Sequence, residues 1–203
     1  MAKTRFLLGR PAGAGPERTE GPGDGGGLNE ANSDINGAMV AFDARGGRLD
    51  QVGDRGAAWT IGAQLITPLH PKPVPSMYKP SLDGKSPDAW SEDLENLLVH
   101  RSSGLMNRLF HFLNQGASAK APSPYATSYL PKGMHGIGND KCARIGCRAM
   151  AGYLTSLSND PDARKACIQA ARDLFGAGGP EERAVWNACH GIHGGEPWVA
   201  SEP

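Results

Sequence analysis

Apolar residues recur with the period of an α-helix through most of the second half of the sequence, and this pattern constrains the fold more than any other feature. Between Asp160 and Gly176 the recurring positions are Ala163, Ala166, Cys167, Ala170, Ala171 and Leu174. Asp160 followed by Pro161 is typical of a helix start, and Gly176 is suited to end that helix. Pro180 opens another helix after a short link, which favours antiparallel neighbours in a helical bundle.

Three more helices are predicted earlier in the chain, and no convincing strand pair is visible. One begins near Leu28 and ends at Gly46-Gly47, and one is capped by Ser102 or Ser103 and ends at Gly116. A third begins at Asp140, with the inward positions Ile145, Cys147, Met150 and Leu154.

The remaining segments have less regular patterns. A short helical stretch is expected from Trp59 to Leu65, and the proline-rich residues 66–96 predict a long surface excursion. His111, on an apolar helix face, is interpreted as a packed core residue. Together these patterns predict a mainly α fold, a helical bundle.

Composition divides the chain into three parts. Residues 1–27 form a low-complexity, glycine-rich segment without periodicity, for which we expect no stable structure. Residues 28–195 form the helical domain, and residues 196–203 a flexible tail.

The chain has 21 basic and 21 acidic residues, so it lacks the positive field that nucleic-acid or anionic-membrane partners require. It also contains no apolar run near the ~20 residues of a membrane span, and no signal-peptide pattern.

The four cysteines allow more than one interpretation. They are Cys142, Cys147, Cys167 and Cys189, and none forms a C-x-x-C pair. Buried, apolar thiols are the favoured reading, while a disulfide stays open on sequence alone. A zinc site at Cys189, His190 or His193 is disfavoured because the spacing matches no usual pattern.

Two acids near the start of the first predicted helix form a candidate site. Glu30 and Asp34 are four residues apart and therefore share one helix face. Taken alone, such a pair also favours the helix macrodipole. A single histidine at a helix entrance, such as His100, is likewise most often a surface or capping residue.

Several collinear segments resemble one family, the thermolysin-like zinc metalloendopeptidases, in their C-terminal helical domain. The stretch GLNEANSDINGAMVAF is similar to the family's Gly-x-x-Asn-Glu-Ala-x-Ser-Asp helix, and VHRSSGLMNRLFHFLNQG to its Val-His-x-x-Ser-Gly-x-x-Asn segment. GIGNDKCARIGCRAMAGYLT and ARKACIQAARDLFG resemble its closing helices. The joint presence of both motifs, about 70 residues apart in the expected order, outweighs the structural explanations of each residue.

The resemblance implies roles for individual residues. Glu30 corresponds to the glutamate ligand of the zinc ion, and Asp34 to the aspartate that orients a ligand histidine. His100 corresponds to the histidine that stabilises the oxyanion of the tetrahedral intermediate, with Glu95 the nearest candidate for its carboxylate partner. The implied substrate is a peptide or protein, and the walls of the specificity pocket would be Ile61, Leu65 and Val74.

The sequence departs from the family at its most important motif, because it contains no His-Glu-x-x-His. Two imidazole ligands and the glutamate that deprotonates the metal-bound water are therefore absent, and the zinc ligand set is incomplete. Pro75 stands where the family has its substrate-binding arginine. Ala41 and Ala63 replace two acids of the double calcium site, so calcium is not expected there.

Three interpretations follow. The first is a C-terminal part of a thermolysin-like endopeptidase, truncated or decayed, lacking its N-terminal catalytic lobe and inactive alone. The second is a non-catalytic helical module that binds a peptide or partner through the same cleft wall. The third is an unrelated helical protein with chance motifs. The resemblance implies an extracellular protein, although the sequence shows no export signal.

Overall fold

The described part of the chain is built from α-helices, as the periodicity predicts. The computed structural model describes residues 24–44, 59–62 and 76–199. Its helices there are α1 (Asp24–Ala44), α2 (Val99–Gln115), α3 (Asn139–Gly152), α4 (Asp160–Phe175) and α5 (Pro180–Gly191). Within these residues, no helix has the length and apolar character needed to span a membrane. The prediction of a mainly α fold is confirmed.

Short elements connect the helices. The 3-10 helices η3 (Pro80–Asp83) and η4 (Glu92–Asn96) precede α2. The two-residue strands β1 (Gly116–Ala117) and β2 (Met134–His135) pair antiparallel, with Gly116 opposite His135. Gly116 ends α2 at a φ of 85°, a backbone conformation that favours glycine.

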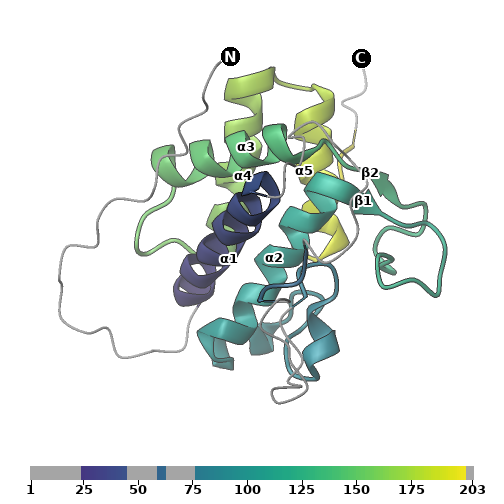
Figure 1. The fold of residues 1–203 in the computed structure, drawn as a ribbon. Coiled ribbons are helices and arrows are strands. Elements are labelled where there is room, and N and C mark those ends of the chain that lie inside the picture. The colour runs from purple at the N-terminus through teal and green to yellow at the C-terminus, as the bar shows by residue number, and fades with distance from the viewer. Residues whose placement is uncertain (1–23, 45–58, 63–75, 200–203) are drawn as a thin grey trace.

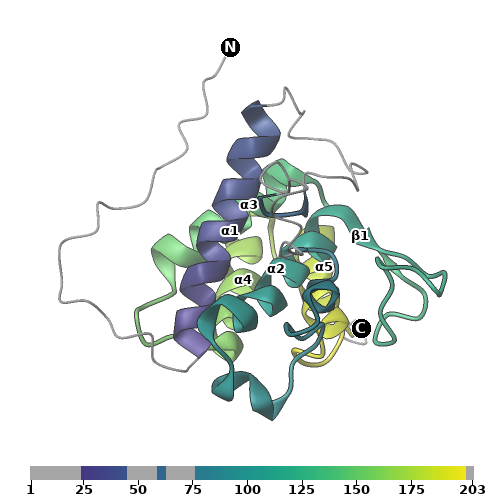
Figure 2. The ribbon, with the colours of Figure 1, turned by 60° about the horizontal axis from the view of Figure 1, so that its bottom comes forward.

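Helix α2 is the centre of the bundle. It packs against α1, α3 and α5, and its residues from Ser102 to Gln115, apart from Met106, are buried. Figures 1 and 2 show α1 lying alongside α2, with α3, α4 and α5 completing the bundle. His111 is fully buried on α2, where its ring meets Trp59 edge-on at 5.2 Å between centroids, as expected for a core histidine.

The start of α2 differs from the prediction. The helix begins at Val99 with Leu98 as its N-cap, so the prediction of a cap at Ser102 or Ser103 is wrong. Both serines are buried inside the helix, and the Ser102 hydroxyl donates to the Val99 carbonyl at 3.3 Å. A Cβ added at Gly27 of α1 would overlap the Ser102 hydroxyl. These small residues therefore serve close packing between α1 and α2 and not helix capping.

The inward face of α3 is also rotated relative to the prediction. Ile145 is buried as predicted and Leu154 packs against the core, but Cys147 and Met150 are exposed, and Cys142 and Ala149 are buried instead. The prediction of the inward face failed in part because apolar residues occur on two faces of this helix, and packing against α2 and α4 buries one of them.

All four cysteines are free thiols. Cys142 and Cys189 are buried as expected, and the expectation of burial is wrong for Cys147.

Two further boundaries differ from the predictions. Trp59 has 3-10 helical geometry, but Thr60 forms a bridge with Ser76, and Ile61 and Gly62 form a turn instead of continuing a helix. Residues 63–65 lie outside the described part. Helix α1 begins at Asp24, before Leu28, and the predicted stop at residues 46 and 47 lies outside the described part.

A buried carboxylate joins α4 to α5. Glu182, 1% exposed, accepts hydrogen bonds from Arg172 Nε at 2.8 Å, the Gly178 amide at 2.7 Å and the Trp186 indole at 3.2 Å. Burial by itself would raise the pKa of Glu182, but these donors bind the charged form and bring the pKa below its ordinary value.

The start of α4 is fixed by a capping box between Asn159 and Asp162, so the N-cap lies one residue before Asp160, where the sequence predicts the helix start.

The contact between α2 and η3 leads to a test of packing. A Cβ at Gly104 would lie 2.8 Å from Pro80 Cβ, whereas a Cβ at Gly146 on α3 would meet nothing within 4 Å. We expect Gly104→Ala to lower the free energy of unfolding by about 1–2 kcal/mol, because overpacking costs about 1–3 kcal/mol and exceeds the gain in helix propensity. Gly146→Ala should raise it by about 0.5–1 kcal/mol.

Urea unfolding followed by circular dichroism measures both variants. Equal stability of Gly104→Ala and Gly146→Ala would show that η3 yields to the added methyl group.

Candidate functional site

The candidate site lies where α1 meets the first turns of α2. Helix α1 carries Glu30 and Asp34 one turn apart, and α2 carries His100 and Asn107 two turns apart. In each helix the spacing places both side chains on one face. The two motifs that are about 70 residues apart in the sequence therefore come together in space.

The central contact joins Glu30 to His100. The distance from His100 Nδ1 to Glu30 Oε2 is 3.0 Å, short enough for a hydrogen bond or ion pair. The His100 side chain is 63% exposed and that of Glu30 is 32% exposed, so the pair opens to solvent. Both groups are thus accessible to a ligand or to another protein surface.

A second contact lies deeper between the same helices. Asn107, 2% exposed, donates from Nδ2 to Asp34 Oδ2 at 2.7 Å, and its Oδ1 has no hydrogen-bond partner. Desolvation by burial is the main cause of a raised pKa at Asp34, and the nearby Glu30 carboxylate raises it further. The Asn107 amide and His100 act in the opposite direction. The charged form of Asp34 is therefore disfavoured by burial and partly stabilised by the hydrogen bond from Asn107.

The other predicted site residues lie in different surroundings. Glu95 is exposed on η4, and His100 has Glu30 as its carboxylate contact in the described part. Ile61 is half-buried and packs against the core. Leu65, Val74 and Pro75 lie outside the described residues. The roles of Glu95, Ile61, Leu65 and Val74 stay predictions.

Asn107 is the site residue that the sequence interpretation missed. It ends the Val-His-x-x-Ser-Gly-x-x-Asn segment, but no role was assigned to it. Its spacing of seven residues from His100 was the available signal, because positions two turns apart share a helix face. Its burial and its contact with Asp34 only emerge in the fold.

The donor set in the described residues does not fit a zinc ion. A catalytic zinc takes three protein ligands and keeps one open position. No group of three or more histidine, cysteine, aspartate or glutamate side chains is placed to hold a metal anywhere in residues 24–44, 59–62 and 76–199. Glu30 offers one carboxylate, and the sequence has no His-Glu-x-x-His to supply the others.

Comparison with known proteins identifies the class of protein to which this chain belongs. The profile of the thermolysin metallopeptidase alpha-helical domain matches residues 22–193. The chain is 34% identical over 174 residues to the thermostable neutral protease NprT of Geobacillus stearothermophilus and to a thermolysin of Alicyclobacillus acidocaldarius. It is 34% identical over 179 residues to the transglutaminase-activating metalloprotease of Streptomyces mobaraensis.

The chain belongs to the thermolysin metallopeptidase family, in its alpha-helical domain. The matched regions cover 83% of this chain but 28% of NprT and of the thermolysin, and 85% of this chain but 22% of the Streptomyces protein. The chain thus spans less than a third of the length of these relatives.

The raised pKa of Asp34 leads to a pH-dependent test. A carboxylate whose folded pKa lies above its unfolded value destabilises the fold above the folded pKa, and this cost disappears below the unfolded value of about 3.9. We therefore expect Asp34→Asn to be more stable than the parent chain at pH 7, and the difference to vanish near pH 3.

Urea unfolding at both pH values provides the measurement. Asp43→Asn is the matched control, an exposed acid on the same helix, and should change the free energy of unfolding by less than about 0.5 kcal/mol. A less stable Asp34→Asn at pH 7 would show that the charged contact with Asn107 outweighs the desolvation.

Proposed function

We propose that this chain is the C-terminal helical part of a zinc-dependent, thermolysin-like endopeptidase site, and that it has no peptidase activity by itself. In a completed site, Glu30 would serve as one metal ligand and His100 would donate a hydrogen bond to the oxyanion formed from the substrate carbonyl. Asp34 would orient a ligand histidine supplied by another lobe. The single observation that supports this most strongly is the 3.0 Å contact between Glu30 and His100.

The geometry agrees with one part of an active site that a second lobe would complete. Both groups are solvent-accessible, as an interface with a second lobe and a substrate requires. The Asp34–Asn107 contact behind them holds α1 against α2. The substrate class, a peptide or protein, comes from the family and from the names of the relatives, which are proteases. An extracellular location belongs to the same proposal.

Activity of the purified chain is the first test. With added zinc, we expect no EDTA-sensitive cleavage of casein, because the described residues gather fewer than three donors for a metal. Calorimetric titration with zinc should likewise show no site of micromolar affinity. EDTA-sensitive cleavage, or micromolar zinc binding, would contradict the incomplete ligand set.

A chimaera tests the roles of Glu30 and His100. Residues 22–193 replace the corresponding region of NprT, so that the relative supplies the rest of the enzyme. We expect Glu30→Gln to abolish zinc retention and activity together. His100→Ala should reduce kcat by about 10²–10³ while zinc is retained, as for the loss of one oxyanion donor.

His135→Ala is the matched control for the chimaera, because His135 is an exposed histidine on β2 outside the candidate site. Its kcat should equal that of the unmodified chimaera. Equal kcat values for the His100→Ala and His135→Ala chimaeras would remove the oxyanion role from His100.

The second candidate function is a non-catalytic module that binds a peptide or partner through this face. The incomplete donor set and the losses at Ala41, Ala63 and Pro75 favour it. A chimaera that folds but stays inactive, together with the absence of zinc binding by the chain, would support this alternative.

A further inference from the structure

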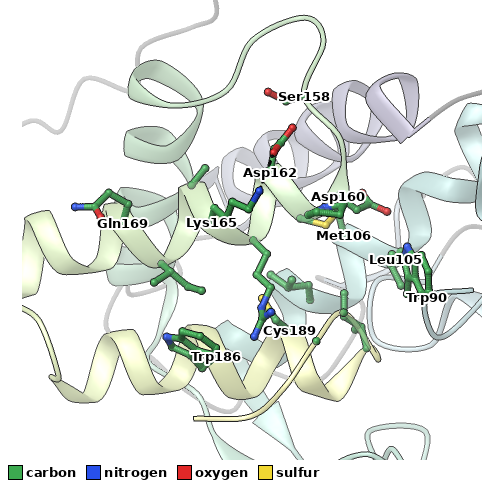
Figure 3. Close-up of a pocket in the computed structure, with 18 of the residues that line it drawn as sticks. Trp90, Leu105, Met106, Ser158, Asp160, Asp162, Lys165, Gln169, Trp186 and Cys189 are labelled. Atoms are coloured by element: carbon green, nitrogen blue, oxygen red, sulfur yellow. Dashed lines mark hydrogen bonds and ion pairs between the residues drawn. The ribbon is translucent and has the colours of Figure 1, made fainter. Parts of the chain in front are cut away.

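A pocket that the residues of the candidate site do not line is not explained by the proposed function. It has a volume of about 930 Å³ and lies between α2, α4, α5 and the segment that follows α5. Figure 3 shows Trp186 on α5 facing α4, with Trp90 and Leu105 toward the opposite end. Further apolar walls are Leu109 and Ile168, and neither Glu30 nor His100 lines this pocket. Its volume lies within the range of small-molecule sites.

One cation in this pocket, Arg164, has no counter-ion among the residues that the structure describes. The Arg164 guanidinium lies over the Trp186 ring, 4.5 Å from its centroid, and Nη2 donates to the Glu196 carbonyl at 2.8 Å. Its Nε is buried and has no hydrogen-bond partner among nitrogen and oxygen atoms, and the thiol of Cys189 lies beside the guanidinium. Within the described residues no carboxylate lies within 4 Å of Arg164, whereas Lys165 pairs with Asp162 and Arg172 with Glu182. A half-buried charge without a counter-ion is costly, and a bound anion would offset that cost.

The backbone holds this guanidinium in place. The segment after α5 passes over it at Gly195, where an added Cβ would overlap Arg164 Nη1. Gly195 has a φ of 133°, which favours glycine, and its carbonyl accepts a hydrogen bond from His190 Nδ1 at 2.9 Å. The segment is thus shaped around the Arg164 side chain, which remains in the pocket.

Other charges narrow the ligand class. Asp160 and Asp162 also line the pocket, so a ligand with several negative charges would be repelled. Burial, chiefly, raises the pKa of the Cys189 thiol to about 12, so this lining thiol is neutral and not a nucleophile. These surroundings suit binding and not covalent chemistry.

We propose that this pocket binds a small organic monocarboxylic acid with an aromatic or branched aliphatic body. Its carboxylate pairs with Arg164, whose planar guanidinium matches a carboxylate in geometry. Its apolar body lies against Trp186, Leu105 and Ile168. The two aromatic rings of Trp90 and Trp186 favour an aromatic body.

The test uses the whole chain and a matched pair of probes. 4-Phenylbutyrate and its neutral analogue 4-phenylbutanamide are titrated into ¹⁵N-labelled protein, and the indole N–H signals of Trp186 and Trp90 are followed by NMR. We expect 4-phenylbutyrate to shift both signals saturably and to bind at least tenfold more tightly than the amide. The signal of Trp59, buried in the core outside this pocket, should stay in place.

Variants assign the effect to Arg164. Arg164→Met should reduce the affinity for 4-phenylbutyrate to that for the amide, while Lys165→Met, which removes a neighbouring cation already paired with Asp162, should leave it within twofold. Arg164→Lys should give an intermediate affinity. Circular dichroism verifies the fold of each variant, and if Arg164→Met does not fold, the comparison of the two probes on the parent chain decides.

Three outcomes would overturn the proposal. These are equal affinities for acid and amide, an unchanged affinity in a folded Arg164→Met, and the absence of any saturable shift at Trp186.

Discussion

The packing of α1 against α2 is the constraint on which the candidate site depends. Gly27 and Ser102 are small enough to let the two helices approach closely, and the buried bond from Asn107 to Asp34 joins them farther along. Because Glu30 and Asp34 share one face of α1, the same packing places Glu30 against His100. The site is thus a consequence of a helix interface, and its geometry is determined by contacts that lie behind it.

The two polar clusters around α4 and α5 differ in how completely their charges are compensated. Glu182 is buried but receives donors from Arg172, Gly178 and Trp186, so its charge stabilises the junction of α4 and α5. Arg164 donates a hydrogen bond to the Glu196 carbonyl and lies over the Trp186 ring, but no carboxylate pairs with it in the described part of the chain. Buried polar groups normally find partners, so an exception in a pocket indicates a ligand more readily than a satisfied network does.

The face with Glu30 and His100 is incomplete in a different sense. Glu30 and His100 are in contact there and open to solvent, but the described residues do not gather the donors that a metal needs. The chain also spans only 28% of the length of relatives such as NprT. On this face one carboxylate and one imidazole are therefore held in contact by the packing of α1 against α2, and this packing involves no metal ligand from outside the two helices.

The sequence by itself determined the helical class, the family, the ends of α2 and α4 and the start of α5, because periodicity, prolines, glycines and motif order are local properties of the chain. It also paired Glu30 with Asp34 and singled out His100. Only the tertiary structure decided which stripe of α3 faces inward, why Ser102 is buried, and that Asn107 binds Asp34. The Arg164 pocket was likewise invisible, because it combines residues of three helices and of the segments that connect or follow them. Such features depend on which side chains meet across helices, and spacing along one helix does not encode the neighbour on another.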